Sequence, residues 1–303
     1  MFRQFSGIVF QSILIIIFLT TIVSANKDFV EHKQKNFTVI YPHTLQHALN
    51  DIVDAYNRAN KNLGKIFSWS IRNHVHLIII KKRSDFIQIA EHPLTVAFAE
   101  PTRHIITINY QAATVDPFSL ETTLQHELCH ILLGEHLSMH IPRWLNEGIA
   151  QWASEGITEI IRPEKNLLQK AAFSGTLIPF YRLEYSFPKE SSAFVLAYEQ
   201  SQNFVVYLVQ QYSKYAFLQM LDLMKTGHSL HSAAHSTYGK SMRQLEYEWV
   251  SSQTQYFEWI IFVINNLYTF LFMGLALISL IAFVRMKRKK WQYPDDWDED
   301  MLQ

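Results

Sequence analysis

Two histidines four residues apart, with a glutamate directly after the first, constrain this chain more than any other feature. His126, Glu127 and His130 form the pattern H-E-x-x-H. Residues four apart lie on one face of an α-helix, so both imidazoles can reach a single metal ion. Glu127 lies at the rim of that face, where its carboxylate can act on a water held by the metal. The pattern therefore predicts a helix that carries two zinc ligands.

The flanking sequence favours a helix at this place. Asp116 and Pro117 fit an N-cap and a first helical residue, and Gly134 fits the end of the helix. Apolar residues at helical spacing form a core-facing stripe on the side away from the histidines: Leu120, Leu124, Leu128 and Ile131. The alternative is an ordinary amphipathic helix whose polar residues are incidental. Cys129, the single cysteine, points away from the histidine pair by helical phase and is expected to be a buried thiol.

A catalytic zinc ion needs a third protein ligand, and two residues can supply it. Glu147 lies in the segment P-R-W-L-N-E-G, which covers residues 142–148. His136 lies ten residues after His126, the position of the third histidine in the metzincin pattern, but that pattern places its turn glycine where this chain has Leu133. We predict Glu147 as the third ligand, with His136 as the alternative.

Apolar segments bracket the chain. The run at residues 7–23 ends in Val-Ser-Ala at 23–25 and predicts a secretory signal peptide over residues 1–25, with an uncleaved signal anchor as the alternative. Residues 259–284 carry no charge and are long enough to cross a bilayer. We therefore predict a transmembrane helix at residues 256–284.

Basic residues set the expected topology. Arg285 and the run K-R-K-K at residues 287–290 follow the second apolar segment. They predict a cytoplasmic tail at residues 285–303 and a domain at residues 26–255 outside the cytoplasm. A domain without disulfides favours the periplasmic face of a bacterial inner membrane. The 27 basic residues equal the 27 acidic residues in number, so the charge gives no indication of a nucleic-acid partner.

The order of the predicted elements indicates an α+β fold. Strands are expected first, with a helix at residues 44–67 between them; the strands cover residues 37–41, 74–80, 94–99 and 104–110. The histidine helix follows. The chain is then mainly helical from Arg143, with helices expected at residues 191–212, 215–225 and 241–253. This order predicts two lobes, a mixed sheet with the histidine helix and then a helical lobe, with a cleft between them.

The histidine pair, Glu147 and the segment W-L-N-E-G-I-A at residues 144–150 together resemble the gluzincin metallopeptidases, specifically the peptidase-MA-like branch related to thermolysin and aminopeptidase N. The similarity is strongest at these motifs and weaker elsewhere between residues 37 and 250. It implies a zincin-like fold in which His126, His130 and Glu147 bind Zn²⁺ and Glu127 is the general base.

The resemblance also suggests roles for residues outside the zinc motifs. Tyr198 matches a tyrosine in the helical half of the relatives and is expected to hydrogen-bond the oxyanion, with a structural phenol as the alternative. In aminopeptidase-N relatives a glutamate upstream of the zinc helix grips the amino group of the substrate. Glu100 is the candidate here, although a turn residue is the favoured interpretation. Asn146 is expected to steady the ligand segment or to cap a helix.

These features predict a membrane-anchored zinc metallopeptidase that hydrolyses peptide bonds in peptide or protein substrates. The alternative, from a different class, is a non-catalytic zincin-like scaffold or binding module in a membrane complex. Glu127 argues against the alternative, because a pure binding module has no use for a base beside the metal.

Overall fold

The computed structural model describes residues 28–292, except residues 138, 157–159 and 161–166. The chain divides into two compact units, Met1–Trp249 and Val250–Gln303. The predicted signal peptide at residues 1–25 lies outside the described residues, as does the end of the predicted cytoplasmic tail from residue 293 onward.

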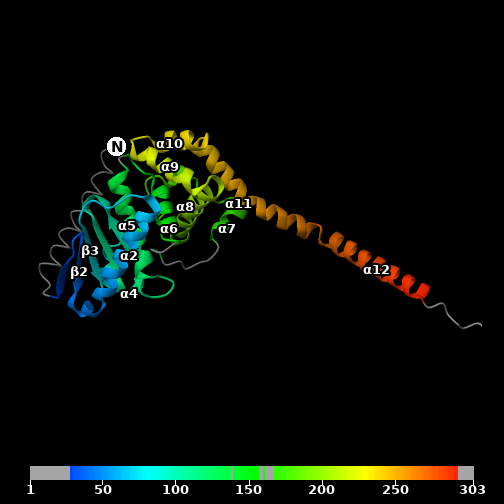
Figure 1. Cartoon of the computed structure of the whole chain (residues 1–303), viewed down its shortest axis with the longest axis horizontal. Helices are drawn as coiled ribbons and strands as arrows, with labels where there is room; N and C mark the ends of the chain where they lie inside the picture. The colour runs from blue at the N-terminus through cyan, green and yellow to red at the C-terminus, as the bar shows by residue number, and fades with distance from the viewer. Residues whose placement is uncertain (1–27, 138, 157–159, 161–166, 293–303) are drawn as a thin grey trace, which may run out of the picture. The chain divides into compact units, whose positions relative to one another are not determined.

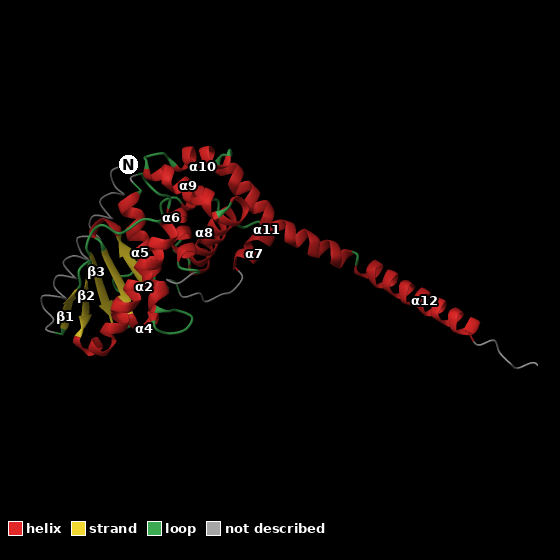
Figure 2. Ribbon diagram, in the orientation of Figure 1, coloured by secondary structure: helices red, strands yellow, loops and turns green. Residues whose placement is uncertain are grey.

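A five-stranded mixed sheet forms the N-terminal half of the first unit (Figures 1 and 2). Its spatial order is β1-β2-β3-β5-β4. The inner pairs β2–β3 and β3–β5 are parallel, while β1 and β4 join their neighbours antiparallel. The strands are β1 (Phe29–Lys33), β2 (Phe37–Pro42), β3 (Val75–Ile80), β4 (Ala97–Glu100) and β5 (Ile105–Asn109). The central strand β3 is almost continuously apolar, as expected for a strand that is covered on both faces.

Helices pack against this sheet. Two long helices, α2 (Leu49–Phe67) and α5 (Leu120–His136), pack against each other beside the sheet, and α5 also contacts β4 (Figure 2). A smaller apolar cluster around Ile78, Ile80 and Phe86 includes the short helix α3 (Arg83–Phe86). Short connecting elements complete this half: η1 (His43–Ala48), η2 (Pro101–Arg103) and α4 (Tyr110–Ala113).

The C-terminal half of the first unit is helical. Its core is aromatic: the Trp144 ring lies 4.6 Å from that of Phe180 and 5.4 Å from that of Phe204, and the Trp249 ring lies 5.3 Å from that of Phe180. The elements are α6 (Arg143–Ala153), α7 (Leu167–Ser174), η3 (Phe180–Leu183), α8 (Ser191–Tyr212), α9 (Lys214–Lys225), α10 (Leu230–Tyr238) and the start of α11 (Met242–Asn265).

Gly148 allows α6 and α8 to pack closely. A Cβ at this position would clash with the backbone carbonyl oxygen of Ser201 and would lie 2.7 Å from Cγ2 of Val205. Both of these residues belong to α8, and neither can move without disturbing that helix. The position of α6, and therefore of the residue before Gly148, depends on this close approach.

The second unit contains the end of α11 and the helix α12 (Leu267–Gln292). The segment Leu267–Lys289 is long and apolar enough to cross a membrane, and its most apolar window of 18 residues has a mean hydropathy of 2.4. This apolar helix begins at Leu267, because α11 continues as far as Asn265.

The predicted α+β class is confirmed, and the helix ends differ in detail. The helix α5 begins at Leu120, where the Ser119 side chain accepts a hydrogen bond from the Thr122 amide, and not after Asp116. It also continues through Gly134 to His136. Gly134 serves a close contact and does not end the helix, because a Cβ there would lie 2.7 Å from Cβ of Pro101.

Candidate active site

The helix α5 brings His126 and His130 together, as the four-residue spacing requires. Their Nε2 atoms lie 3.1 Å apart, and both side chains are buried. Two ring nitrogens at this distance point toward a common centre. Because both nitrogens are buried, little water would compete with a cation for them.

Glu147 reaches the same centre from α6. Its Oε2 atom lies 3.6 Å from Nε2 of His126 and 3.5 Å from Nε2 of His130. Three ligands around a tetrahedral zinc ion at about 2.1 Å would be separated by about 3.4 Å, so the three observed distances fit such an ion. In the described part of the chain, these three residues form the one group of histidines and acidic residues close enough together to hold a metal.

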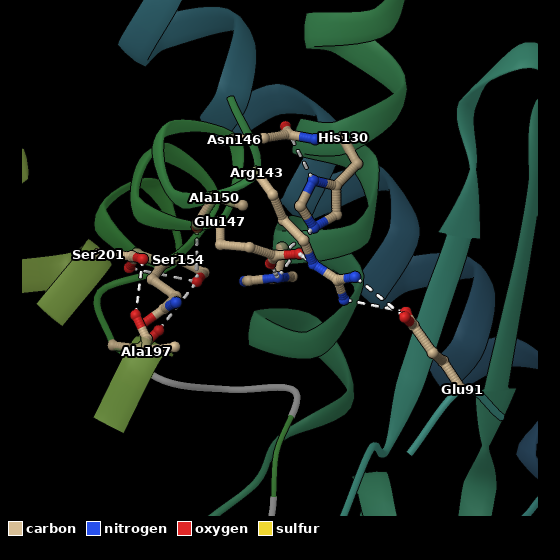
Figure 3. Close-up of polar contacts among 12 residues, drawn as sticks. Glu91, His130, Arg143, Asn146, Glu147, Ala150, Ser154, Ala197 and Ser201 are labelled. Atoms are coloured by element: carbon tan, nitrogen blue, oxygen red, sulfur yellow. Dashed lines mark hydrogen bonds and ion pairs between the residues drawn. The ribbon is translucent and has the colours of Figure 1, made fainter. Parts of the chain in front are cut away.

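Asn146 contacts the ring nitrogen of His130 that faces away from the shared centre (Figure 3). Nδ1 of His130 donates a hydrogen bond to Oδ1 of Asn146 at 3.1 Å. This bond leaves the lone pair of Nε2 directed toward Glu147. A partner on the far ring nitrogen is the usual way in which proteins orient a metal-binding histidine. Asn146 lies inside α6, so it steadies the histidine and does not cap a helix.

The electrostatic environment keeps Glu147 ionised. Burial by itself raises the pKa of this carboxyl group, but His130, His126 and Arg143 oppose it and lower the pKa to about 2. The Glu147 carboxylate has two sides: Oε2 faces the histidines, and Oε1 lies 3.8 Å from Nε of Arg143. A buried anion facing two imidazoles matches the donor set that zinc prefers.

The two predicted catalytic side chains are both buried. Glu127 follows His126 on α5 and is fully inaccessible to solvent. Tyr198 lies on α8, with its ring 4.9 Å from that of Phe187 and 5.0 Å from that of Phe194. Burial tends to lower the pKa of Arg143, but Tyr198 and the carboxylates of Glu91 and Glu147 raise it above its usual value. The Arg143 guanidinium and the Tyr198 ring both contact Phe187, at 5.0 and 4.9 Å from its ring centroid.

His136, the alternative third ligand, and Glu100, the candidate for binding the substrate amino group, contact other residues instead. Both ring nitrogens of His136 are engaged away from the histidine pair: its Nε2 donates to the Ser70 carbonyl oxygen at 2.9 Å, and its Nδ1 accepts from Arg72 at 3.3 Å. Glu100 forms an ion pair at 3.2 Å with Arg103, across the turn that follows β4. The structure thus places Glu147, and not His136, beside the histidine pair.

Cys129 is fully buried, and burial raises the pKa of its thiol. A protonated thiol without solvent access is a poor nucleophile and a poor metal ligand. Its environment agrees with the buried thiol expected from helical phase.

Sequence reasoning did not identify Arg143 and Glu91 as neighbours of the site. The Arg143 guanidinium donates to both carboxylate oxygens of Glu91, at 3.0 and 2.9 Å (Figure 3). Arg143 precedes Glu147 by four residues on α6, and this spacing was a usable signal for the first contact. Glu91 gave no such signal, because it lies in an irregular segment 52 residues away in the chain.

Two solved structures are similar to part of this chain. One is aminopeptidase A from Legionella pneumophila in complex with aspartic acid, with 13% sequence identity and a TM-score of 0.45; the match covers 73% of this chain and 27% of that one. Another is a mutant of an M1 zinc metallopeptidase from Deinococcus radiodurans, with 16% identity and a TM-score of 0.43, covering 73% of this chain and 50% of that one. This chain therefore spans half or less of these proteins. No curated protein matches the sequence.

The family comparison covers the site itself. The sequence model of the Peptidase MA superfamily matches residues 73–255. This match includes most of the sheet, the histidine helix and the helical half, and it is more than half of the 303 residues. It also includes His126, His130 and Glu147. The chain belongs to the Peptidase MA superfamily.

Proposed function

We propose that this protein is a membrane-anchored zinc metallopeptidase that hydrolyses peptide bonds. One observation carries the proposal: His126, His130 and Glu147 bring three buried ligand atoms to within 3.1 to 3.6 Å of one another. Membership of the Peptidase MA superfamily supports the reaction class. Peptides or proteins are the expected substrates.

Three protein ligands are the number that catalytic zinc sites use, because a fourth position must stay open for water or substrate. A zinc ion held by His126, His130 and Glu147 would supply a Lewis acid that lowers the pKa of water and polarises the scissile carbonyl. Asn146 contributes by fixing the ring orientation of His130. Arg143 contributes a positive charge 3.8 Å from the Glu147 oxygen that does not face the histidines.

Glu127 is assigned as the general base. Its carboxylate takes the proton from the attacking water and passes it to the departing amine. Two observations support this role: Glu127 is adjacent to His126 on the helix that carries both histidines, and its side chain is shielded from solvent. A shielded carboxylate can exchange protons with the reacting groups without competition from bulk water.

Tyr198 is assigned as a hydrogen-bond donor to the oxyanion. Two observations support a place near the reacting carbonyl: Tyr198 lies on α8, against which α6 packs, and its ring contacts Phe187, which also contacts Arg143. A phenol hydroxyl directed at developing negative charge is one of the groups that stabilise such transition states. Tyr198→Phe tests this assignment, because it removes the hydroxyl and keeps the ring packing against Phe187 and Phe194.

The membrane anchor is assigned to α12. The segment Leu267–Lys289 has the length and hydropathy of a spanning helix, and the basic residues from Arg285 onward favour a cytoplasmic C-terminus. Residues 26–255 then form the extracytoplasmic peptidase domain, behind a signal peptide at residues 1–25. With a single cysteine, the periplasmic side of a bacterial inner membrane is the proposed location.

The decisive experiment compares the detergent-solubilised full chain with its Glu127→Ala variant. Zinc content and cleavage of a broad peptide library are measured for both. We expect about one zinc per chain in each protein, with cleavage by the wild type and a loss on the order of 10³-fold in the variant. Zinc-loaded wild type that cleaves no peptide would instead favour the non-catalytic scaffold.

A further inference from the structure

The Glu147 carboxylate lies between Arg143 and the histidine pair, and Arg143 contacts a second carboxylate on its other side. On one side its Nε atom lies 3.8 Å from Oε1 of Glu147. On the other side its two Nη atoms form a two-point hydrogen-bonded pair with Glu91. The planar guanidinium fork matches carboxylate geometry in this arrangement better than any other side chain.

The two carboxylates that contact Arg143 differ in how easily another carboxylate can displace them. Glu147 is buried and is committed to the histidine pair. The Glu91 side chain is 70% exposed, while the Arg143 side chain is only 21% exposed. The Glu91 carboxylate can exchange its contact with Arg143 for water, whereas the Glu147 carboxylate is shielded from solvent. Glu91 is therefore the partner that a competing carboxylate can displace.

Displacement of Glu91 needs only a rotation of its side chain. The backbone on its C-terminal side is anchored, since Arg83 donates hydrogen bonds to the carbonyl oxygens of Pro93 and Thr95. The neighbouring His92 ring stacks on Phe194 of α8 at 4.0 Å. The segment can thus keep its conformation while the carboxylate swings into solvent.

Arg143 itself is held in place for such an exchange. Its guanidinium lies over the ring of Phe187, 5.0 Å from the ring centroid. Stacking on an aromatic ring restricts the fork to one plane and preserves its donors for a ligand in that plane. A receptor whose orientation is fixed in advance binds with less loss of entropy.

The receptor is close enough to the reaction centre to contact a substrate. The contacts that link His130, Glu147, Arg143 and Glu91 are 3.5, 3.8 and 2.9 Å long. The carboxylate on Arg143 therefore lies within roughly 15 Å of the histidine pair, a distance that about four extended residues can span. A substrate carboxylate in this range belongs to the residues that flank the scissile bond.

We infer that Arg143 is a specificity-determining residue that binds a substrate carboxylate near the scissile bond, and that Glu91 occupies this receptor until substrate arrives. This inference rests on the proposed peptidase function. The carboxylate can be an acidic side chain or the C-terminus of the substrate. Both offer the same two oxygen atoms to Arg143.

The test uses peptides that the full chain cleaves, each resynthesised in four forms. Glutamate is compared with glutamine near the scissile bond, and a free C-terminus is compared with an amidated one. We expect kcat/KM to be higher, by about tenfold or more, for the form that carries the preferred carboxylate. The side-chain pair and the terminal pair distinguish the two sources. Equal rates for all four forms would overturn the inference.

Two variants assign the preference to the Arg143–Glu91 pair. Glu91→Gln should raise kcat/KM for the carboxylate-bearing peptide relative to the neutral peptide roughly fivefold, mainly through KM. Arg143→Gln should abolish the preference, with zinc content measured to exclude an effect through Glu147. Glu121→Gln is the matched control, because Glu121 forms another exposed pair, with Arg58 at 2.6 Å. An equal gain for both peptides in Glu91→Gln would contradict the exchange.

A binding measurement separates this inference from the proposed function. The zinc-loaded Glu127→Ala protein is titrated calorimetrically with the same four peptides. Tighter binding of the carboxylate-bearing form, lost in the double variant with Arg143→Gln, supports the receptor even if no cleavage is ever observed. Equal affinities count against the receptor, whereas absent cleavage by the wild type counts against the peptidase.

Discussion

Histidines gather with a glutamate at two places in the first unit: around His126 on α5, and beside the starts of strands β3 and β5. In the first cluster the ligand atoms of three side chains face a common centre. In the second, His104 lies 3.0 Å from Glu135, and His74 lies 2.9 Å from the Thr38 hydroxyl. The two clusters have similar composition and different geometry.

The difference lies in where the lone pairs are used. The Glu135 carboxylate accepts hydrogen bonds from the backbone amides of Arg72 at 2.6 Å and Asn73 at 3.0 Å. It therefore holds the backbone of the loop before β3 in place. Glu147 instead directs one oxygen at two imidazole nitrogens. A group that satisfies protein donors stabilises the fold, whereas convergent acceptors require a cation between them. The proposal of a metal site at the first cluster therefore rests on this convergence, and not on the number of histidines.

The largest effect is expected when the two glutamates are compared directly. Glu147→Gln removes the anionic ligand, so zinc content should fall to a small fraction and peptide hydrolysis should fall on the order of 10³-fold. Glu135→Gln should keep one zinc per chain. Metal analysis after dialysis against a zinc buffer measures both. Zinc lost from Glu135→Gln and retained by Glu147→Gln would reverse our assignment of the two clusters.

A smaller effect is expected for the side chains that hold the histidines. Asn146→Ala frees the His130 ring, and we expect zinc affinity to fall about 10- to 100-fold. Thr38→Val, which removes the hydroxyl beside His74, is the matched change in the other cluster and should leave zinc affinity unaltered. Competition with a chromogenic chelator measures both affinities. Equal affinities in Asn146→Ala and the wild type would show that the hydrogen bond does not support metal binding.

The free energy of unfolding should respond to changes in the second cluster, whereas zinc binding responds to changes in the first. Glu135→Ala leaves two backbone amides without their charged acceptor, so the free energy of unfolding should fall by about 1–3 kcal/mol while zinc binding stays intact. Urea unfolding of the detergent-solubilised protein gives this value. Glu121→Ala, which removes an exposed ion pair, should cost less than about 1 kcal/mol. A larger loss in Glu121→Ala would contradict the structural role of Glu135.

The smallest effect concerns the pH dependence of the second cluster. Burial, His74 and His104 lower the pKa of His76 below its usual value of 6.5, and Glu31 opposes them only in part. The unfolded chain then binds more protons than the native chain just below pH 6.5, so His76 makes stability fall as the pH drops through this window. In His76→Gln, the free energy of unfolding should depend less on pH just below pH 6.5. An unchanged slope between pH 6.5 and 5 would exclude the effect.

The sequence predicted those parts of the site that depend on local spacing. The four-residue interval between His126 and His130 becomes a shared centre on any regular helix, and the segment containing Glu147 could be compared with a known family pattern. The strands β2 and β3 were also found within a residue or two, because their apolar runs are strong. The exposed edge strand β1 was missed, since its sequence F-V-E-H-K carries charge and little hydrophobicity.

The features that were not predicted depend on tertiary contacts. The pair of Arg143 and Glu91 joins segments 52 residues apart, and nothing in either local sequence indicates the other. The end of α5 was misplaced because Gly134 looks like a helix stop, whereas its role is to admit Pro101. The start was misplaced because Asp116 and Ser119 are both acceptable N-caps, and only the packed chain chooses between them.

The contact between Gly148 and α8 has a consequence for the proposed metal site. Glu147 is the neighbour of Gly148, so the distance from its carboxylate to the two imidazoles is fixed by how closely two helices approach at Ser201 and Val205. Any side chain at position 148 would push a ligand outward while leaving every ligand chemically unchanged. The affinity of the proposed metal site would therefore also depend on apolar packing between α6 and α8, at atoms that do not contact the ion.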